Sequence, residues 1–307
     1  MRKKVSVVGA GNVGATLAQM LAQTGLADIV LFDVVKDMPQ GKALDIAETC
    51  PLWGVSVFVM GTNEYADLKD SDVIIITAGV ARKPGMSRDD LLATNASITK
   101  EVSREIAKHS PDAIVVTVTN PMDVMAQVVY RETGFDARRV IGMGGILDAS
   151  RLRAFVAMEL GVSTQDVEAL VLGGHGDQMV PLPRYTTVRG IPLAELMDSR
   201  QIEKVMERTR NGGAEIVALL KSGSAFYAPA ASTLQMVKAM LLDEKRVAPC
   251  AVLLNGEYGV KGTFGGVPVV LGARGVERII ELELERHERH ALHDSIKSVE
   301  KLFAKIY

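Results

Sequence analysis

The chain has 307 residues, 48% of them hydrophobic, and its 35 Lys and Arg nearly balance its 37 Asp and Glu, for a formal net charge of −2. A chain of this length and composition buries a large core without disulfides or metals, which excludes intrinsic disorder. It also lacks the basic charge that would hold a polyanion. We therefore expect about two domains and no nucleic-acid partner.

The two cysteines and the N-terminal residues indicate in which cellular compartment the protein works. Cys50 and Cys250 lie far apart and outside any C-x-x-C spacing, which favours a reducing compartment and argues against a structural zinc site. Residues 1–4 imitate the basic start of a signal peptide, but glycines interrupt the apolar stretch that follows and no A-x-A cleavage site is present. No run approaches about 18 apolar residues. We expect a cytoplasmic protein with no membrane contact and no bound metal.

In the first half of the chain, short apolar runs alternate with helical patterns. The predicted strands are 5–8, 29–32, 73–77 and 114–118, and the predicted helices are 12–23, 41–48 and 90–109. Continuous apolar strands separated by helices are typical of a parallel sheet that is buried on both faces. Residues 1–145 are therefore predicted to form a doubly wound α/β domain of the Rossmann type.

After about residue 145 the pattern changes. A helix at 149–160 leads to an apolar strand at 167–172, and strand-turn-strand signals follow at 184–191 and 252–260. Long helices are predicted at 200–222 and 230–242, and the segment 276–306 is predicted to be a charged helix. No repeat or low-complexity linker is present. Residues 146–307 are thus predicted to form an α+β domain packed against the first.

A dinucleotide-binding motif follows the first predicted strand. Gly9-Ala10-Gly11-Asn12-Val13-Gly14 fits G-x-G-x-x-G and opens a predicted helix, and Asp33 ends the next strand about 20 residues further on. The glycines permit a tight turn and the approach of a pyrophosphate to the helix N-terminus. Asp33 would bind the adenosine ribose and repel a 2′-phosphate, which favours NAD over NADP. A glycine turn without a ligand is the alternative. No P-loop sequence occurs.

Among the five histidines, His175 differs from the four that lie in charged helical stretches, because it lies between glycines after an apolar strand. Asp148 and Arg151 are three residues apart at the start of a predicted helix and share roughly one face. An enzyme that transfers hydride to a carbonyl needs an acid and a cation. Asp148 would fix the tautomer of His175 and raise its pKa, and Arg151 would grip a carboxylate. A structural histidine is the alternative.

Two further segments follow buried strands and leave the carboxyl edge of the sheet, where ligands bind in open α/β folds. Residues 77–90 place glycines and a proline around three cations, which suits a loop that closes over a bound anion. Asn120-Pro121 ends the strand at 114–118 at the same edge. A solvated basic loop and a simple turn are the alternatives.

Together these residues resemble the lactate and malate dehydrogenase family, and within it the lactate-dehydrogenase-like malate dehydrogenases. The resemblance covers almost the whole chain. It runs through GAGNVG, the strand that ends in Asp33, ITAGVARKPGMSR, VTNPMD, DASR, GGHGD and residues 224–227.

The resemblance implies a role for each site residue. His175 would be the proton donor and acceptor, with Asp148 as its partner and Arg151 as the anchor of the substrate's 1-carboxylate. Arg88 would polarise the carbonyl and Asn120 would bind the substrate oxygen. Besides the glycine motif and Asp33, the implied cofactor contacts are Asn95, Val118, Thr119 and Asn120.

Arg82 stands where lactate dehydrogenases carry glutamine. A cation there pairs with the second carboxylate of oxaloacetate and is left uncompensated by the methyl group of pyruvate. At an effective dielectric constant of about 20 and a separation of about 4 Å, the attraction is roughly 4 kcal/mol before screening. The resemblance thus implies an NAD-dependent malate dehydrogenase of the tricarboxylic acid cycle, assembled as a homodimer or homotetramer. The alternatives are a lactate or other 2-hydroxy-acid dehydrogenase, an NAD-dependent glycosidase and a non-enzymatic NAD-binding protein.

Overall fold

A computed structural model describes residues 2–80 and 87–307, and the main sheet of this part of the chain has nine strands in the order β14-β13-β12-β6-β5-β4-β1-β2-β3. Six of them are parallel and come from the first half. Their order is that of the Rossmann fold, so the predicted fold class is confirmed. These strands are β1 (Lys3–Val8), β2 (Ala27–Phe32), β3 (Val59–Thr62), β4 (Val73–Ile76), β5 (Ile114–Thr117) and β6 (Val140–Gly142).

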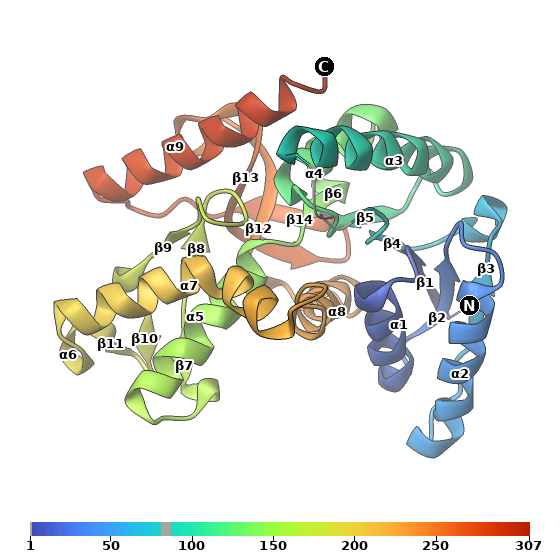
Figure 1. Cartoon of the computed structure of the whole chain (residues 1–307), viewed down its shortest axis with the longest axis horizontal. Coiled ribbons are helices and arrows are strands. Elements are labelled where there is room, and N and C mark those ends of the chain that lie inside the picture. Colours follow the sequence, from blue (N-terminus) through green and yellow to red (C-terminus); the bar gives the residue numbers. More distant parts are fainter. Residues whose placement is uncertain (1, 81–86) are drawn as a thin grey trace.

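Helices cover both faces of this sheet (Figure 1). Alternate residues of β4 point to opposite faces: Val73 and Ile75 belong to one core cluster, and Ile74 and Ile76 to the other. The first cluster lies under α1 (Asn12–Thr24), α2 (Met38–Trp53) and α8 (Tyr227–Leu241), and the second under α3 (Arg88–His109) and α4 (Met122–Thr133). None of the described helices is long and apolar enough to cross a membrane.

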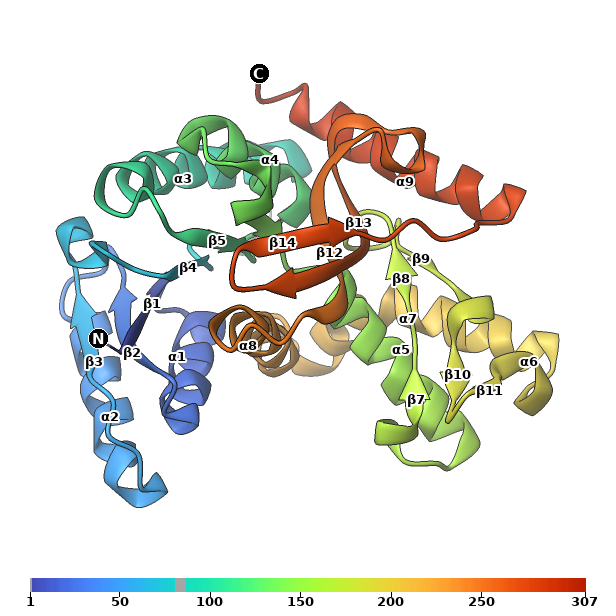
Figure 2. The same ribbon diagram turned by 180° about the vertical axis from the view of Figure 1, so that it is seen from behind.

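The second half of the chain extends the same sheet. The antiparallel strands β12 (Arg246–Asn255), β13 (Lys261–Gly272) and β14 (Gly275–Ile279) follow β6 across the pairing of Ala251 with Gly142. Figure 2 shows these strands beside the parallel ones. The two halves therefore share one sheet.

The rest of the second half holds the helices and two small sheets. The helices are α5 (Gly145–Leu160), α6 (Leu193–Leu196), α7 (Ser199–Leu220) and α9 (Arg286–Phe303). The small sheets are formed by β7 (Val167–Glu168), β10 (Thr187–Val188) and β11 (Ile191–Pro192), and by β8 (Val171–Leu172) and β9 (Val180–Pro181). Short 3-10 helices lie at Tyr65–Leu68, Ala137–Arg139, Thr164–Asp166, Pro183–Tyr185 and Glu257–Gly259.

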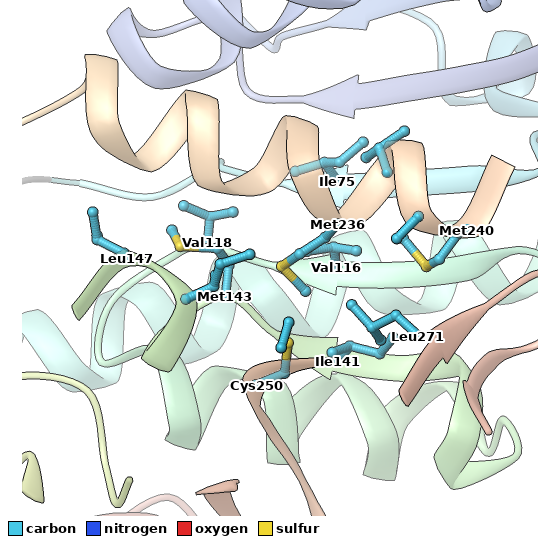
Figure 3. Close-up of a cluster of buried hydrophobic side chains, with 14 of the residues drawn as sticks. Ile75, Val116, Val118, Ile141, Met143, Leu147, Met236, Met240, Cys250 and Leu271 are labelled. Atoms are coloured by element: carbon cyan, nitrogen blue, oxygen red, sulfur yellow. The ribbon is translucent and has the colours of Figure 1, made fainter. Parts of the chain in front are cut away.

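Helix α8 joins the cores of the two halves. Its Met236 and Met240 point toward Val116 and Ile141 of the parallel sheet, with Cys250 of β12 beside them (Figure 3). Burial raises the pKa of the Cys250 thiol to about 12, which keeps it protonated and unreactive. This cysteine acts as a small apolar residue of a core to which both halves contribute.

Two predicted elements are wrong. The single strand expected at 167–172 is two strands in different sheets, because β7 pairs with β10 and β8 pairs with β9. The segment 276–306, expected to be one helix, starts as strand β14, because residues 276–279 pair with β13. Its helix, α9, starts only after Glu285, which forms a capping box with Glu288. The short strands β3 and β6 and the helix α4 were not expected at all.

Candidate active site

Three loops meet at the carboxyl edge of the sheet. They follow the neighbouring strands β1, β4 and β5, and the boundary between β1 and β4 is where the strand order reverses. A crevice forms outside a parallel sheet at such a switch point, and ligands of open α/β folds bind there. The structure thus brings the glycine motif, the start of the 77–90 loop and Asn120 to one edge, as predicted.

The glycine motif is built around close backbone contacts. Gly9 has a φ of 109°, and a Cβ atom there would lie 2.6 Å from the backbone nitrogen of Ala78. A Cβ atom on Gly14 would overlap the carbonyl oxygen of Gly9. Ala10 is fully buried, whereas Gly11 and Asn12 are exposed and Val13 is half-buried. Only glycine therefore suits both ends of the turn.

The start of α1 fits a pyrophosphate. Gly11 is its N-cap residue, no described side chain caps the helix, and a Cβ atom on Gly11 would meet nothing within 4 Å. The first backbone N–H groups of the helix are consequently free to bind an anion that approaches closely. Asp33, half-buried at the end of β2, accepts hydrogen bonds from the backbone N–H groups of Ala10 (2.7 Å) and Val35 (3.0 Å).

Asn95 and Thr119 hold the neighbouring loops together. The Asn95 side chain is buried; its Nδ2 donates to the Asn120 carbonyl at 2.7 Å and its Oδ1 accepts from the Val80 N–H at 2.8 Å. Thr119 Oγ1 donates to the Ala78 carbonyl at 2.6 Å. Val118 is buried and Asn120 is exposed, and the Asn120-Pro121 bond is cis. The polar atoms of Asn95 are therefore engaged by the backbone, so its contribution to the site is to shape these loops.

The three residues singled out in the second half form one cluster around the buried Asp148. Asp148 and Arg151 lie on α5, and His175 lies in the loop that follows β8. Asp148 Oδ2 is 2.9 Å from His175 Nδ1, and Asp148 Oδ1 is 3.2 Å from Arg151 Nη1. The Asp148 side chain is only 2% exposed. Because Asp148 engages Nδ1, the His175 Nε2 is the ring nitrogen left for proton exchange.

The electrostatics of the cluster favour a protonated histidine. Burial by itself lowers the pKa of His175, but the charge and hydrogen bond of Asp148 and the charge of Asp123 raise that pKa above its ordinary value, against the opposing charge of Arg151. A histidine with a raised pKa keeps its proton to higher pH than a free imidazole does, and it can give that proton to a developing alkoxide.

The backbone of the His175 loop is fixed at three successive residues. Gly173 exchanges two backbone hydrogen bonds with Gly266 of β13, the Gly174 N–H donates to Ser295 Oγ of α9 at 2.8 Å, and the His175 N–H donates to Asp123 Oδ2 of α4 at 2.8 Å. Neither Asp123 nor Ser295 was singled out from the sequence. Asp123 lies within the quoted VTNPMD segment, but nothing in that segment indicates a contact with residue 175.

The two remaining predicted site residues are Arg82 and Arg88. Arg82 lies outside the described residues. Arg88 is the first residue of α3, whose start is fixed by a capping box between Ser87 and Asp90. The Ser87 side chain accepts from the Asp90 N–H, and the Asp90 side chain accepts from the Ser87 N–H.

Comparison with known proteins identifies the family. Residues 3–142 match the model for the lactate/malate dehydrogenase NAD binding domain, and residues 146–306 match that for the lactate/malate dehydrogenase alpha/beta C-terminal domain. A protein of Heliobacterium modesticaldum named malate dehydrogenase is 53% identical over 303 residues, which are 99% of this chain and 98% of that protein.

Solved structures of both kinds of enzyme resemble the fold. The malate dehydrogenase of Cryptosporidium parvum has a TM-score of 0.97 at 43% identity, covering 100% of this chain and 99% of that one. The lactate dehydrogenase of the same organism, in complex with lactic acid and nicotinamide adenine dinucleotide, has a TM-score of 0.96 at 41% identity, covering 100% and 98%. The chain therefore belongs to the lactate/malate dehydrogenase family and is an oxidoreductase that uses NAD.

Proposed function

We propose that the chain interconverts (S)-malate and oxaloacetate, with His175 as the general base and acid. The observation that carries the chemistry is the buried contact of 2.9 Å between Asp148 and His175 Nδ1 beside a guanidinium. Relatives that are 53% to 55% identical over nearly the whole chain and named malate dehydrogenase support the choice of substrate.

The roles follow from the chemistry of each group. Arg151 binds the substrate 1-carboxylate through its planar guanidinium. In malate oxidation, neutral His175 takes the hydroxyl proton at Nε2, and in oxaloacetate reduction, protonated His175 returns it. The glycine motif and Asp33 would hold NAD, which would supply the hydride acceptor for malate oxidation and, as NADH, the hydride donor for oxaloacetate reduction. Asp148 holds the ring in one tautomer and stabilises the imidazolium, and Arg88 and Asn120 bind the reacting oxygen.

The backbone does not choose between the two substrates, since solved structures of a malate and a lactate dehydrogenase both resemble it closely. The choice rests with side chains. A guanidinium at position 82 pairs with the second carboxylate of oxaloacetate. Against the methyl group of pyruvate, the same guanidinium would lose water without gaining a partner. Lactate, or another 2-hydroxy acid, is the rival substrate.

The proposed cofactor-binding and proton-transfer residues lie in different halves of the chain, which agrees with the proposed reaction. We assign NAD binding to residues 1–145, which contain the glycine motif and Asp33, and substrate binding and proton transfer chiefly to residues 146–307, which contain Asp148, Arg151 and His175. The two cysteines are buried and unpaired, which favours a reducing compartment, and we place the enzyme in the cytoplasm.

Exposed apolar side chains favour self-association. Leu44 and Leu52 on α2 are 63% and 83% exposed, and Leu219 on α7 is 74% exposed. Large apolar side chains exposed on helices favour pairing with another chain, and symmetric homo-oligomers are the commonest outcome. We propose a homodimer or homotetramer.

The oligomer is expected to show a solution mass of two or four times 33.0 kDa in light scattering after size exclusion. Replacing Leu52 by Glu should lower that mass, because a buried unpaired carboxylate opposes association. Glu48→Gln on the same helix changes an exposed charge and serves as the control. A monomeric wild-type protein would contradict this proposal.

The substrate test compares NADH oxidation with oxaloacetate and with pyruvate. We expect kcat/KM to favour oxaloacetate by about a hundredfold or more, because the charge pair at Arg82 is worth several kcal/mol before screening. Arg82→Gln should narrow this ratio, mainly by weakening the reaction with oxaloacetate. Lys83→Gln removes a neighbouring charge and is the control. A wild-type preference for pyruvate would reject malate as the substrate while leaving the fold and cofactor in place.

The proton-transfer role of His175 is tested by His175→Asn. We expect kcat to fall by about a hundredfold or more, since general acid-base catalysis typically contributes that much. NADH affinity, followed by nucleotide fluorescence, should stay near that of the wild-type protein. His290→Asn on the exposed face of α9 is the control. Turnover near the wild-type rate would remove His175 from this role.

Cofactor choice is tested by Asp33→Asn, which keeps an acceptor for the Ala10 N–H but removes the charge that repels a 2′-phosphate. NADH affinity should fall by about tenfold with the weakened ribose contacts, and the preference for NADH over NADPH should narrow. Fluorescence titration with both nucleotides measures this. Asp45→Asn on α2 is the matched control. An unchanged ratio of the two affinities would exclude Asp33 as the selecting residue.

A further inference from the structure

Asp123 is a buried carboxylate to which the reaction described above assigns no role. It lies in the first turn of α4 and is 4% exposed. Its Oδ2 accepts the backbone N–H of His175 at 2.8 Å, and its Oδ1 is buried with no hydrogen-bond partner in the described part of the chain. A neutral acceptor could bind this single backbone N–H, and burying a charged carboxylate costs far more free energy than burying a neutral acceptor.

The neighbouring loop residue shows what a purely structural contact requires. The Gly174 N–H donates to the hydroxyl of Ser295 at 2.8 Å, so α9 fixes one residue of the loop with a neutral group. A neutral amide at position 123, as in Asp123→Asn, would offer the His175 N–H a similar acceptor. The charge of Asp123 is therefore not needed to anchor the backbone.

The other charges around His175 indicate what the negative charge of Asp123 does. Among the described residues, the charged groups that act on His175 come from two elements: α5 supplies Asp148 and Arg151, and α4 supplies Asp123. Helix α9 and strand β13, which also hold the loop, supply only Ser295 and the backbone of Gly266. Two negative charges and one positive charge leave the surroundings with a charge of −1 when all three are ionised. Protonation of His175 cancels this charge.

We propose that Asp123 is a positioning residue for the reaction, which fixes the His175 backbone from α4 and whose negative charge, with that of Asp148, stabilises the imidazolium form. The proposal rests on the proposed function of His175. Without the Asp123 charge, the charges of Asp148 and Arg151 would cancel each other, and neither would compensate the positive charge that protonation of His175 adds.

The titration of Asp123 agrees with this arrangement. Burial raises the pKa of the Asp123 carboxyl to about 6, while the hydrogen bond and charge of His175 hold it lower than burial alone would. The two groups therefore titrate as an interacting pair, and Asp123 is ionised at and above neutral pH, where its charge acts on His175.

The test is the pH dependence of Asp123→Asn in both directions of the reaction. Oxaloacetate reduction needs protonated His175 and declines as the pH rises through its pKa, whereas malate oxidation needs the neutral ring and declines as the pH falls through it. Loss of the Asp123 charge should lower the pKa of His175, so the pH at which each direction declines should fall by about one unit in the kcat/KM profiles. One unit is at the small end of the pKa shifts that a neighbouring charge causes. The position of the limbs on the pH axis is the readout, because a substitution cannot change the equilibrium constant that fixes the ratio of the two directions at one pH.

Ser295→Ala is the matched control, because it removes a neutral hydrogen bond to Gly174, the residue before His175 in the same loop. It should lower the melting temperature and depress both directions alike, with the limbs of the pH profile unmoved. If Asp123→Asn behaves in the same way as Ser295→Ala, Asp123 is a structural anchor only and the inference fails. If the wild-type protein turns over neither oxaloacetate nor pyruvate, the proposed function fails instead.

A measurement on the wild-type protein keeps the inference testable if Asp123→Asn does not fold. With NADH bound, nuclear magnetic resonance of labelled histidine and aspartate follows the His175 ring and the Asp123 carboxyl across the pH range. We expect a carboxyl that titrates near pH 6 and a His175 ring signal that responds at the same pH. A ring signal that shows one isolated titration would overturn the inference.

Discussion

The buried contact between Asp148 and His175 is the interaction on which the rest of the site depends. Asp148 is almost completely removed from water, and its charge is compensated by His175 on one oxygen and Arg151 on the other. Such partners offset the high cost of burying an ionised carboxylate. The contact therefore fixes the loop after β8 to α5, and Asp148 holds His175 and Arg151, the proposed proton-transfer and carboxylate-binding residues, in one cluster.

The shared sheet holds this cluster against the cofactor loops. The glycine motif and Asn120 are fixed by the parallel strands β1 and β5, while the His175 loop is fixed by β13, α9 and α4. Because β12 pairs with β6, these two sets of supports are parts of one continuous structure. Helix α8 adds side chains from the second half to the core under the parallel strands. Hydride transfer needs two reactants held at a fixed distance, and a shared sheet supplies that rigidity.

The elements with strong local signals were predicted correctly. Helices α1, α3 and α7 and strands β1, β2, β4 and β5 follow from apolar periodicity and from the turn residues between them. The errors fall where periodicity is ambiguous. A run such as 167–172 is apolar throughout most of its length, and only its pairing partners in two different sheets divide it. The strand β14 forms because β13 is beside it, a contact that no local pattern records.

The sequence by itself determined the parallel α/β core, the glycine turn with Asp33, and the candidate cluster of Asp148, Arg151 and His175, because these depend on residue types and short spacings. Only the tertiary structure decided that the two halves share one sheet, that Asn95 is engaged by loop backbone, and that Asp123 and Ser295 hold the His175 loop. Asp123 is 52 positions from His175 in the chain. No pattern within a segment reports a contact between segments, since that contact exists only once both have packed against the same sheet.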